Sequence, residues 1–216
     1  TQVKQKTTMA KTVFLNPRYG LSMIGHEALQ SQISLTATLG ASDSMVANQQ
    51  ACTSSLVHYV EGTEDDALAY CGQLQKALKR WDSAMPHTLP RSTLGQLRAL
   101  RRGAFLGGRW FINGQSPDIE SAVVYMQSPF DLQLHTMSRL IVVRRVDSLD
   151  DVIPFLNPSV STVGIYPAER IPDLRDIVSA CGVSNVFCLG DIENVYTGMP
   201  HDGMRILSEL VNWVNG

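Results

Sequence analysis

The second half of the chain alternates short apolar runs with segments of helical pattern, and no other feature limits the fold as strongly. The apolar runs lie at residues 140–146, 159–165 and 186–189. Between them, we expect one helix to begin at Ser148 and another to run from Pro172 to Gly182. Strands joined through helices are typically parallel, because a parallel pair needs a long crossover connection. The sequence therefore predicts an α/β fold with a mostly parallel sheet flanked by helices.

The first half of the chain fits the same architecture. We expect strands at residues 12–15, 21–24 and 56–60, and helices at residues 27–39, 63–81 and 92–102. Gly40 is placed to end the first of these helices, and the acidic residues 64–66 suit the first turn of the second. Residues 105–127 read as an irregular hairpin around Asn113-Gly114. These segments extend the predicted sheet toward the N-terminus.

Composition and charge exclude several classes of protein. The chain has 216 residues, of which 44% are hydrophobic and 18% charged, as in a globular protein. The net charge of −2 gives no reason to expect nucleic acid, and no apolar run approaches the ~20 residues of a membrane span. Residues 1–11 are polar, lack the apolar core of a signal peptide and read as a frayed arm before a domain at 12–216. We expect a cytoplasmic protein with reduced cysteines and no metal site.

One cysteine lies in a run of small polar residues and is the candidate nucleophile. Residues 48–55 read Asn-Gln-Gln-Ala-Cys-Thr-Ser-Ser and precede the expected strand at 56–60, so Cys52 lies in a loop on a rigid support. A thiol there can attack an acyl or aldehyde carbon and hold the product covalently. The alternative is that Cys52 is a small buried hydrophobic residue, as most cysteines are.

A histidine near the C-terminus is the candidate activator of that thiol. A free thiol has a pKa of about 8.5, which a nearby imidazolium or helix N-terminus can lower. His201 precedes Asp202, which is placed to cap a last helix at residues 204–214, and follows the loop after the strand at 186–189. Ligands of open α/β sheets bind at the carboxyl ends of such strands. The alternative is that residues 201–203 only shape a tight turn, and His58, inside an apolar strand, is expected to be structural.

Five arginines form the densest basic cluster of the sequence. They are Arg91, Arg98, Arg101, Arg102 and Arg109. They are either ordinary surface charges or a site for a phosphate of coenzyme A or a nicotinamide cofactor, since arginine binds phosphate in a forked geometry. Gly107-Gly108 lacks the third glycine and the strand-to-helix setting of a dinucleotide fingerprint.

Two segments of the sequence match the motifs of a known family. They are residues 49–52, Gln-Gln-Ala-Cys, and residues 198–205, Gly-Met-Pro-His-Asp-Gly-Met-Arg. They resemble the nucleophile segment and the C-terminal segment of the LuxC family, the fatty-acyl reductases of bacterial bioluminescence. Residues 16–24 are a looser match. The resemblance implies a fold similar to the catalytic domain of aldehyde dehydrogenases, with Cys52 as the acyl-accepting residue and hydride from NADPH releasing a fatty aldehyde. It also implies substrate or oxyanion contacts from Asn48, Gln49 and Gln50, beside backbone N–H groups near Cys52.

The resemblance further implies that this sequence is half of a longer enzyme. Chains of the family are about twice as long, and their cofactor-binding half precedes the cysteine segment. NADPH would then be bound mainly by a domain absent from this sequence, and residues 12–216 would be the catalytic domain. Acyl transfer to Cys52 would survive in isolation, with little hydride transfer. The implied partners are a fatty acyl thioester or acylated protein, an acyl-protein synthetase and further copies in a homo-oligomer.

Two other functions fit the same residues. The chain can be a non-catalytic α/β domain that contributes an oligomerisation or partner-binding surface, which a buried and unreactive Cys52 would favour. It can also be a cysteine acyltransferase or thioesterase, which would turn over acyl donors without a nicotinamide.

Overall fold

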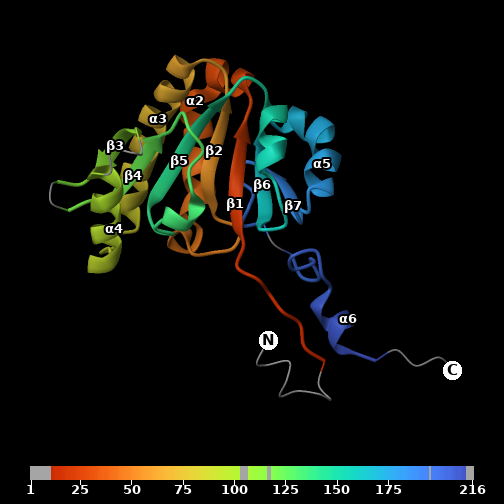
Figure 1. Ribbon diagram of the computed structural model, residues 1–216. Coiled ribbons are helices and arrows are strands. Elements are labelled where there is room, and N and C mark those ends of the chain that lie inside the picture. Colours follow the sequence, from red (N-terminus) through yellow and green to blue (C-terminus); the bar gives the residue numbers. More distant parts are fainter. Residues whose placement is uncertain (1–10, 103–106, 116–117, 195, 213–216) are drawn as a thin grey trace.

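A computed structural model describes residues 11–102, 107–115, 118–194 and 196–212 of the chain. It contains a seven-stranded sheet with the order β3-β4-β5-β2-β1-β6-β7 (Figure 1). The strands are β1 Tyr19–Ile24, β2 Ser55–Glu61, β3 Arg109–Asn113, β4 Ser121–Tyr125, β5 Leu140–Val146, β6 Val160–Tyr166 and β7 Asn185–Cys188. Every neighbouring pair is parallel except β3 and β4, which form an antiparallel hairpin. The predicted mostly parallel sheet is confirmed.

Helices cover both faces of the sheet. The α-helices are α2 His26–Met45, α3 Glu64–Ala84, α4 Arg91–Arg102, α5 Ile171–Ala180 and α6 Ile206–Leu210, and the short turns are η1 Val46–Gln49, η3 Leu132–Leu134, η4 Leu149–Phe155 and η5 Ala168–Arg170. One apolar cluster joins α2 and α3 to the sheet, and a second joins α4, η4 and α5 to the other face. Strand β5 shows why both faces need cover: Leu140 and Val142 enter one cluster, and Ile141 and Val143 enter the other.

Helix α2 continues past the glycine that was expected to end it. A Cβ at Gly40 would lie 2.5 Å from the Tyr70 hydroxyl and 3.0 Å from the His58 ring, so glycine is needed here for close packing rather than as a stop. His58 accepts or donates hydrogen bonds at 2.9 Å to Ser44 and to Tyr70, and burial lowers its pKa to about 3. The imidazole is therefore neutral at physiological pH, and the structural role expected for His58 is confirmed.

Both ends of the described chain differ from the sequence prediction. Residues 12–15 form no strand, and the extended segment 11–18 runs beside the C-terminal segment, where Lys11 donates a hydrogen bond to the Val211 carbonyl (Figure 1). The last helix is only α6, and Asp202 does not cap it, because Asp202 lies in a turn with φ 51°. The helix expected from Ser148 is the 3-10 turn η4, which contains Pro154. Part of the expected hairpin, residues 105–106 and 116–117, lies outside the described residues.

Among the described residues, no helix combines the length and the apolar character that a membrane crossing requires.

Candidate active site

Cys52 follows a left-handed turn that leads into β2. Three successive residues of η1, Ala47, Asn48 and Gln49, have φ angles of 44°, 57° and 69°. Residues with a Cβ avoid this region, at a cost of roughly 1–2 kcal/mol each. Contacts elsewhere must therefore hold the turn, and two buried side chains provide them.

The first contact is made by the side chain of Gln49, which is 1% exposed. Its Nε2 donates to the carbonyl of Leu140 at 2.6 Å, and its Oε1 accepts from the Leu140 N–H at 3.0 Å. A further bond runs from Nε2 to the Ser55 carbonyl at 3.3 Å. The carboxamide thus pairs with the first residue of β5 as a neighbouring strand would, and it fastens the cysteine loop to the sheet.

The second contact is made by Arg139, whose Nε donates to Asn48 Oδ1 at 2.7 Å. The same guanidinium pairs with the carboxylate of Asp82 and donates to the Met85 carbonyl at 2.9 Å. The side chains of Arg139 and Asp82 are 4% and 6% exposed. Separating such a pair would leave a buried charge without compensation, so the pair anchors the turn firmly. The loop that carries Cys52 is thereby tied to the end of α3 and the start of β5.

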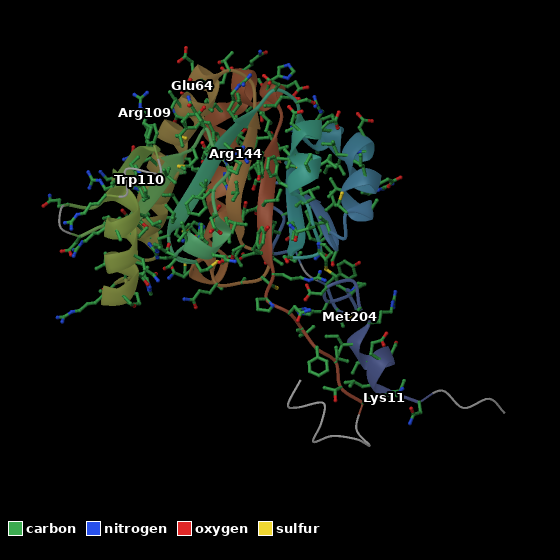
Figure 2. The ribbon with its side chains drawn as sticks, in the orientation of Figure 1. Lys11, Glu64, Arg109, Trp110, Arg144 and Met204 are labelled. Carbon is green, nitrogen blue, oxygen red and sulfur yellow. The ribbon has the colours of Figure 1, made fainter. Side chains whose placement is uncertain are left out.

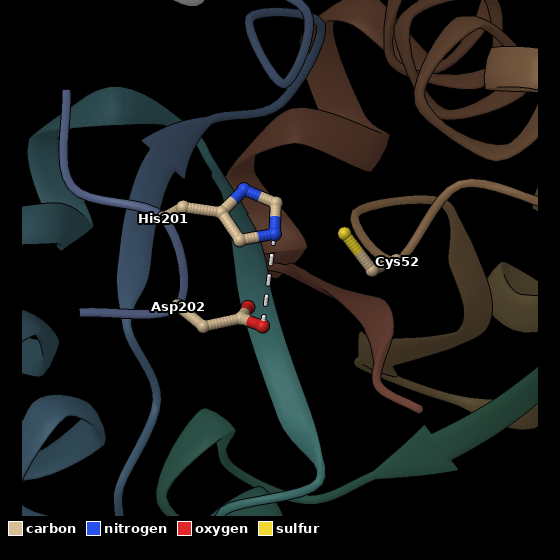
Figure 3. Close-up of side chains that lie close together, drawn as sticks. All are labelled: Cys52, His201 and Asp202. Carbon is tan, nitrogen blue, oxygen red and sulfur yellow. Dashed lines mark ion pairs between the residues drawn. The ribbon is translucent and has the colours of Figure 1, made fainter. Parts of the chain in front are cut away.

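The side chain of Cys52 lies close to those of His201 and Asp202, although about 150 residues separate the cysteine from them in sequence. The cysteine Sγ, a ring nitrogen of His201 and a carboxylate oxygen of Asp202 all lie within 4.8 Å of one another (Figure 3). His201 Nε2 is 3.9 Å from Asp202 Oδ2, and Arg18 Nη1 is 3.7 Å from Asp202 Oδ1. Asp202 therefore lies between a histidine and an arginine and faces the thiol. The sequence-based hypothesis that the His201 segment lies beside Cys52 is confirmed.

These side chains line an open cavity of about 570 Å³. Its wall includes Cys52, Arg18, Gln50, Met137, His201 and Asp202. Cys52 is half-buried and the side chain of His201 is 50% exposed, so the reacting groups are reachable from solvent. The volume lies within the range of small-molecule sites, which are typically about 300–1,000 Å³.

The cavity lies at the amino ends of the central parallel strands, not at their carboxyl ends. Cys52 precedes β2, and Arg18 precedes β1. After β7 the chain contacts α2, where the Gly190 N–H donates to Asp43 at 2.7 Å. Farther along, Gly203 lies beside Ser184, which directly precedes β7. The expectation of a site at the carboxyl ends is therefore wrong. Although His201 follows β7 in sequence, it lies near the amino ends of the strands.

The resting thiol is not activated in the way that the sequence suggested. Burial raises the pKa of Cys52, and the carboxylate of Asp202 raises it further, whereas the residue's own N–H and the Arg18 guanidinium lower it by less. No α-helix of the described residues begins at Cys52, since the loop leads into a strand. The expected lowering of the thiol pKa is thus wrong for the resting site, and deprotonation needs a base at the moment of attack.

The three predicted oxyanion residues occupy different surroundings. The Gln49 carboxamide is taken up by backbone groups of Leu140 and Ser55, whereas Gln50 is exposed and lines the cavity. The Asn48 amide lies at 3.5 Å from Ser138 Oγ. Their roles at an oxyanion stay predictions, and the structure adds a supporting role for Gln49.

Among the residues that the structure describes, two groups of cysteine, histidine or acidic side chains are spaced so that they could hold a metal ion. One is Cys52, His201 and Asp202, and the other is His26, Glu27 and Glu61 at the opposite edge of the sheet. The second group already pairs with Arg170, whose guanidinium binds both glutamates at 2.9 and 3.1 Å. The sequence predicts no metal site, and that remains a prediction.

Three of the five clustered arginines line a second cavity, of about 480 Å³. These are Arg98, Arg101 and Arg102 on α4, where Arg98 lies 3.7 Å from Asp118. The start of the same helix faces the cysteine cavity through Pro90 and Thr93. Helix α4 therefore connects the two cavities, and the binding of a phosphate there stays a prediction.

The sequence analysis missed Arg18 and the Arg139–Asp82 pair. Arg18 lies in the segment 16–24 that matched the family only loosely, and that match was the one signal that could have found it. Arg139 and Asp82 lie in separate elements, and a single sequence gives no sign that they form a pair.

The fold resembles part of the aldehyde dehydrogenase fold. The structure of an oxidoreductase from Marinobacter aquaeolei superposes with a TM-score of 0.62 at 12% identity, covering 87% of this chain and 42% of that one. An indole-3-acetaldehyde dehydrogenase of P. syringae in complex with NAD+ and IAA gives 0.59 at 14% identity, covering 84% and 39%. Identities this low establish the fold alone.

The family is shown by sequence. The family model described as acyl-CoA reductase (LuxC) matches residues 3–213, so the chain belongs to the LuxC acyl-CoA reductase family. A long-chain acyl-protein thioester reductase of Aliivibrio fischeri is 28% identical over 201 residues, 92% of this chain and 40% of that protein. A second such enzyme, from Photorhabdus luminescens, is 26% identical over 83% of this chain and 37% of its own length. The chain thus spans less than half the length of these relatives.

Proposed function

We propose that this chain is the cysteine-bearing part of a fatty-acyl reductase, in which Cys52 carries the acyl group as a thioester. The observation that supports this most is the meeting of Cys52, His201 and Asp202 in one open cavity. In the proposed step, Cys52 Sγ attacks the acyl carbon and its proton passes to His201. The donor's bond to the acyl carbon then breaks, and His201 returns the proton to the leaving thiolate.

Asp202 and Arg18 position the histidine in this scheme. The carboxylate of Asp202 lies 3.9 Å from His201 Nε2 and orients the ring toward Cys52. The raised pKa of Cys52 keeps the thiol protonated until a donor occupies the cavity. The imidazolium then adds a second positive charge beside the thiolate, in addition to that of Arg18.

The described residues do not form a dinucleotide cradle of the kind that binds a pyrophosphate at a helix N-terminus. The helices that follow parallel strands begin with acidic residues: Glu27 in α2, residues 64–66 in α3 and Asp173 in α5. Negative charge in the first turn opposes the binding of phosphate there. A nicotinamide, when bound, supplies the hydride that converts the thioester to an aldehyde, and we assign NADPH to a separate domain.

The arginine cavity on α4 suggests how the acyl donor is held. A helix rises about 1.5 Å per residue, so Thr93 and Arg101 lie roughly 12 Å apart along α4. A donor with a phosphate-bearing arm, such as coenzyme A, can place its thioester near Cys52 and its phosphates near Arg98 and Arg101. An acylated partner protein, such as an acyl-protein synthetase, is the alternative donor, and we keep the homo-oligomer as a further proposal.

A cysteine thioesterase or acyltransferase is the second candidate, because a cysteine, histidine and aspartate suffice for acyl transfer without any nicotinamide. Intact-mass measurements after adding a long-chain acyl-CoA distinguish the two. A persistent single adduct supports the reductase, whereas an adduct that disappears as free acid accumulates supports the thioesterase.

The matched controls for this experiment are Cys52→Ala and Cys181→Ala, since both cysteines are half-buried. We expect the adduct to vanish in the first variant and to persist in the second. If the parent chain gives no adduct although an alkylating reagent modifies Cys52, the proposal fails.

A further inference from the structure

Arg144 is a buried cation that has no carboxylate partner among the described residues. It belongs to β5, is 9% exposed and is labelled near the middle of the sheet in Figure 2. Its Cζ lies 4.7 Å from the ring centre of Phe155 and 5.6 Å from that of Tyr59. Within the described part of the chain it forms no ion pair; the Tyr59 hydroxyl accepts a hydrogen bond from the guanidinium, and the Nε of Arg144 is buried without an acceptor.

Arg145, the next residue of β5, has the partners that Arg144 lacks. Arg145 points to the outside, pairs with Asp147 and donates to the Gly62 carbonyl at 2.7 Å. Two aromatic rings offset part of the desolvation of Arg144 by cation–π attraction. They leave the Nε–H without a partner, however, and a buried charge is costly unless it is both paired and hydrogen-bonded. The described residues therefore give Arg144 a neutral hydroxyl as acceptor but no anionic one.

A cavity of about 100 Å³ lies against this guanidinium. Its other walls are apolar or aromatic and include Tyr19, Leu21, Val57, Phe130, Leu132 and Phe155. Tyr19 also lines the Cys52 cavity, so the two cavities share one wall. An apolar cavity of about 150 Å³ accommodates the six heavy atoms of benzene, so this smaller one suits a ligand of roughly four or five heavy atoms.

We propose that this cavity binds a short aliphatic monocarboxylate, with propionate as the representative ligand. The carboxylate accepts from the Arg144 guanidinium, and the alkyl end packs on Leu21, Val57 and Phe130. The site is separate from Cys52 and does not depend on the function proposed for it. It gives the buried cation the counter-charge that the protein itself does not provide.

Isothermal calorimetry of the full chain with sodium propionate tests the proposal, with propionamide and sodium chloride as neutral and inorganic controls. We expect propionate to bind and to raise the thermal midpoint, since a ligand that binds only the folded state stabilises it. We expect neither control to do so at equal concentration. An equal effect of chloride, or of propionamide, would overturn the proposal.

Arg144→Met and Arg145→Gln form the matched pair of variants. Arg144→Met keeps an apolar chain of similar length without the charge, so we expect propionate binding to weaken at least tenfold while the unliganded variant stays as stable as the parent chain. Arg145→Gln should bind like the parent. Unchanged binding in Arg144→Met contradicts the inference. If that variant does not fold, Arg144→Lys is measured instead. We expect it to bind propionate more weakly than the parent chain, because lysine lacks the forked geometry of arginine. Equal binding of propionate by Arg144→Lys would contradict the proposal.

Discussion

Replacing Gln49 by methionine isolates the contact that holds the cysteine loop. Methionine is similar in length and apolar, so it fills the space but leaves the N–H and C=O of Leu140 without the partners that Gln49 provides at 3.0 and 2.6 Å. Each buried group left unsatisfied costs about 1–3 kcal/mol. We therefore expect Gln49→Met to lower the free energy of unfolding by about 2–6 kcal/mol.

The loop that carries Cys52 should lose more stability than the rest of the fold when Gln49 is replaced. Without Gln49, only the contact of Arg139 with Asn48 remains of the two that hold the left-handed turn, and the strain of its φ angles favours other conformations. Urea unfolding gives the stability change, and the alkylation rate of Cys52 below the unfolding transition reports the loop. Gln50→Met is the matched control, because Gln50 is exposed on the same turn. The reasoning is refuted if the two variants unfold at the same urea concentration.

Three further predictions concern packing, charge and pH. Gly40→Ala should destabilise the folded chain by about 1–3 kcal/mol through overpacking. Gly72→Ala, whose Cβ would have no heavy atom within 4 Å, should stabilise the folded chain by roughly 0.5–1 kcal/mol, and thermal unfolding measures both changes. The opposite order of stabilities would contradict the packing described for Gly40. Asp202→Asn removes a charge that raises the pKa of Cys52, so the pH profile of Cys52 alkylation should move to lower pH, and a profile that stays in place would count against the electrostatic account. Burial raises the pKa of Glu61, but its hydrogen bonds and a neighbouring arginine lower that pKa more, so the pKa is depressed in the folded state. The stabilisation of the fold by ionised Glu61 is therefore present above the unfolded-state pKa of about 4.3. It is lost as the pH falls through the folded-state pKa. Parent and Glu61→Gln should accordingly differ in urea midpoint at pH 6 and converge near pH 3, and a constant difference would rule this out.

The sheet could be predicted from the sequence because its central strands are buried on both faces. The run at 140–146 is apolar apart from two arginines, the run at 159–165 consists of apolar and small residues, and β5 and β6 occupy Leu140–Val146 and Val160–Tyr166. Helix ends were harder to place. Gly40 reads as a stop, yet tertiary packing against Tyr70 and His58 decides its role, and local propensity cannot show this.

The active site could be predicted only as far as its motifs reach. Cys52 and His201 were singled out from residue type and family resemblance, and their meeting was a hypothesis until the fold was known. The left-handed turn was not foreseen, because Ala47, Asn48 and Gln49 include no glycine to signal it. The effect of Asp202 on the thiol pKa was also missed, since it depends on a distance between segments remote in sequence.

The most direct test of the central claim is to map where an acyl group attaches. The chain is incubated with an acyl-CoA that carries a terminal alkyne, digested, and the labelled peptides are identified by mass spectrometry before and after hydroxylamine treatment. We predict one labelled peptide, containing Cys52, from which hydroxylamine removes the label as expected for a thioester. Label on a peptide of Cys71, Cys181 or Cys188 instead, or on none while Cys52 reacts with iodoacetamide, would contradict the assignment of Cys52 as the acyl-accepting residue.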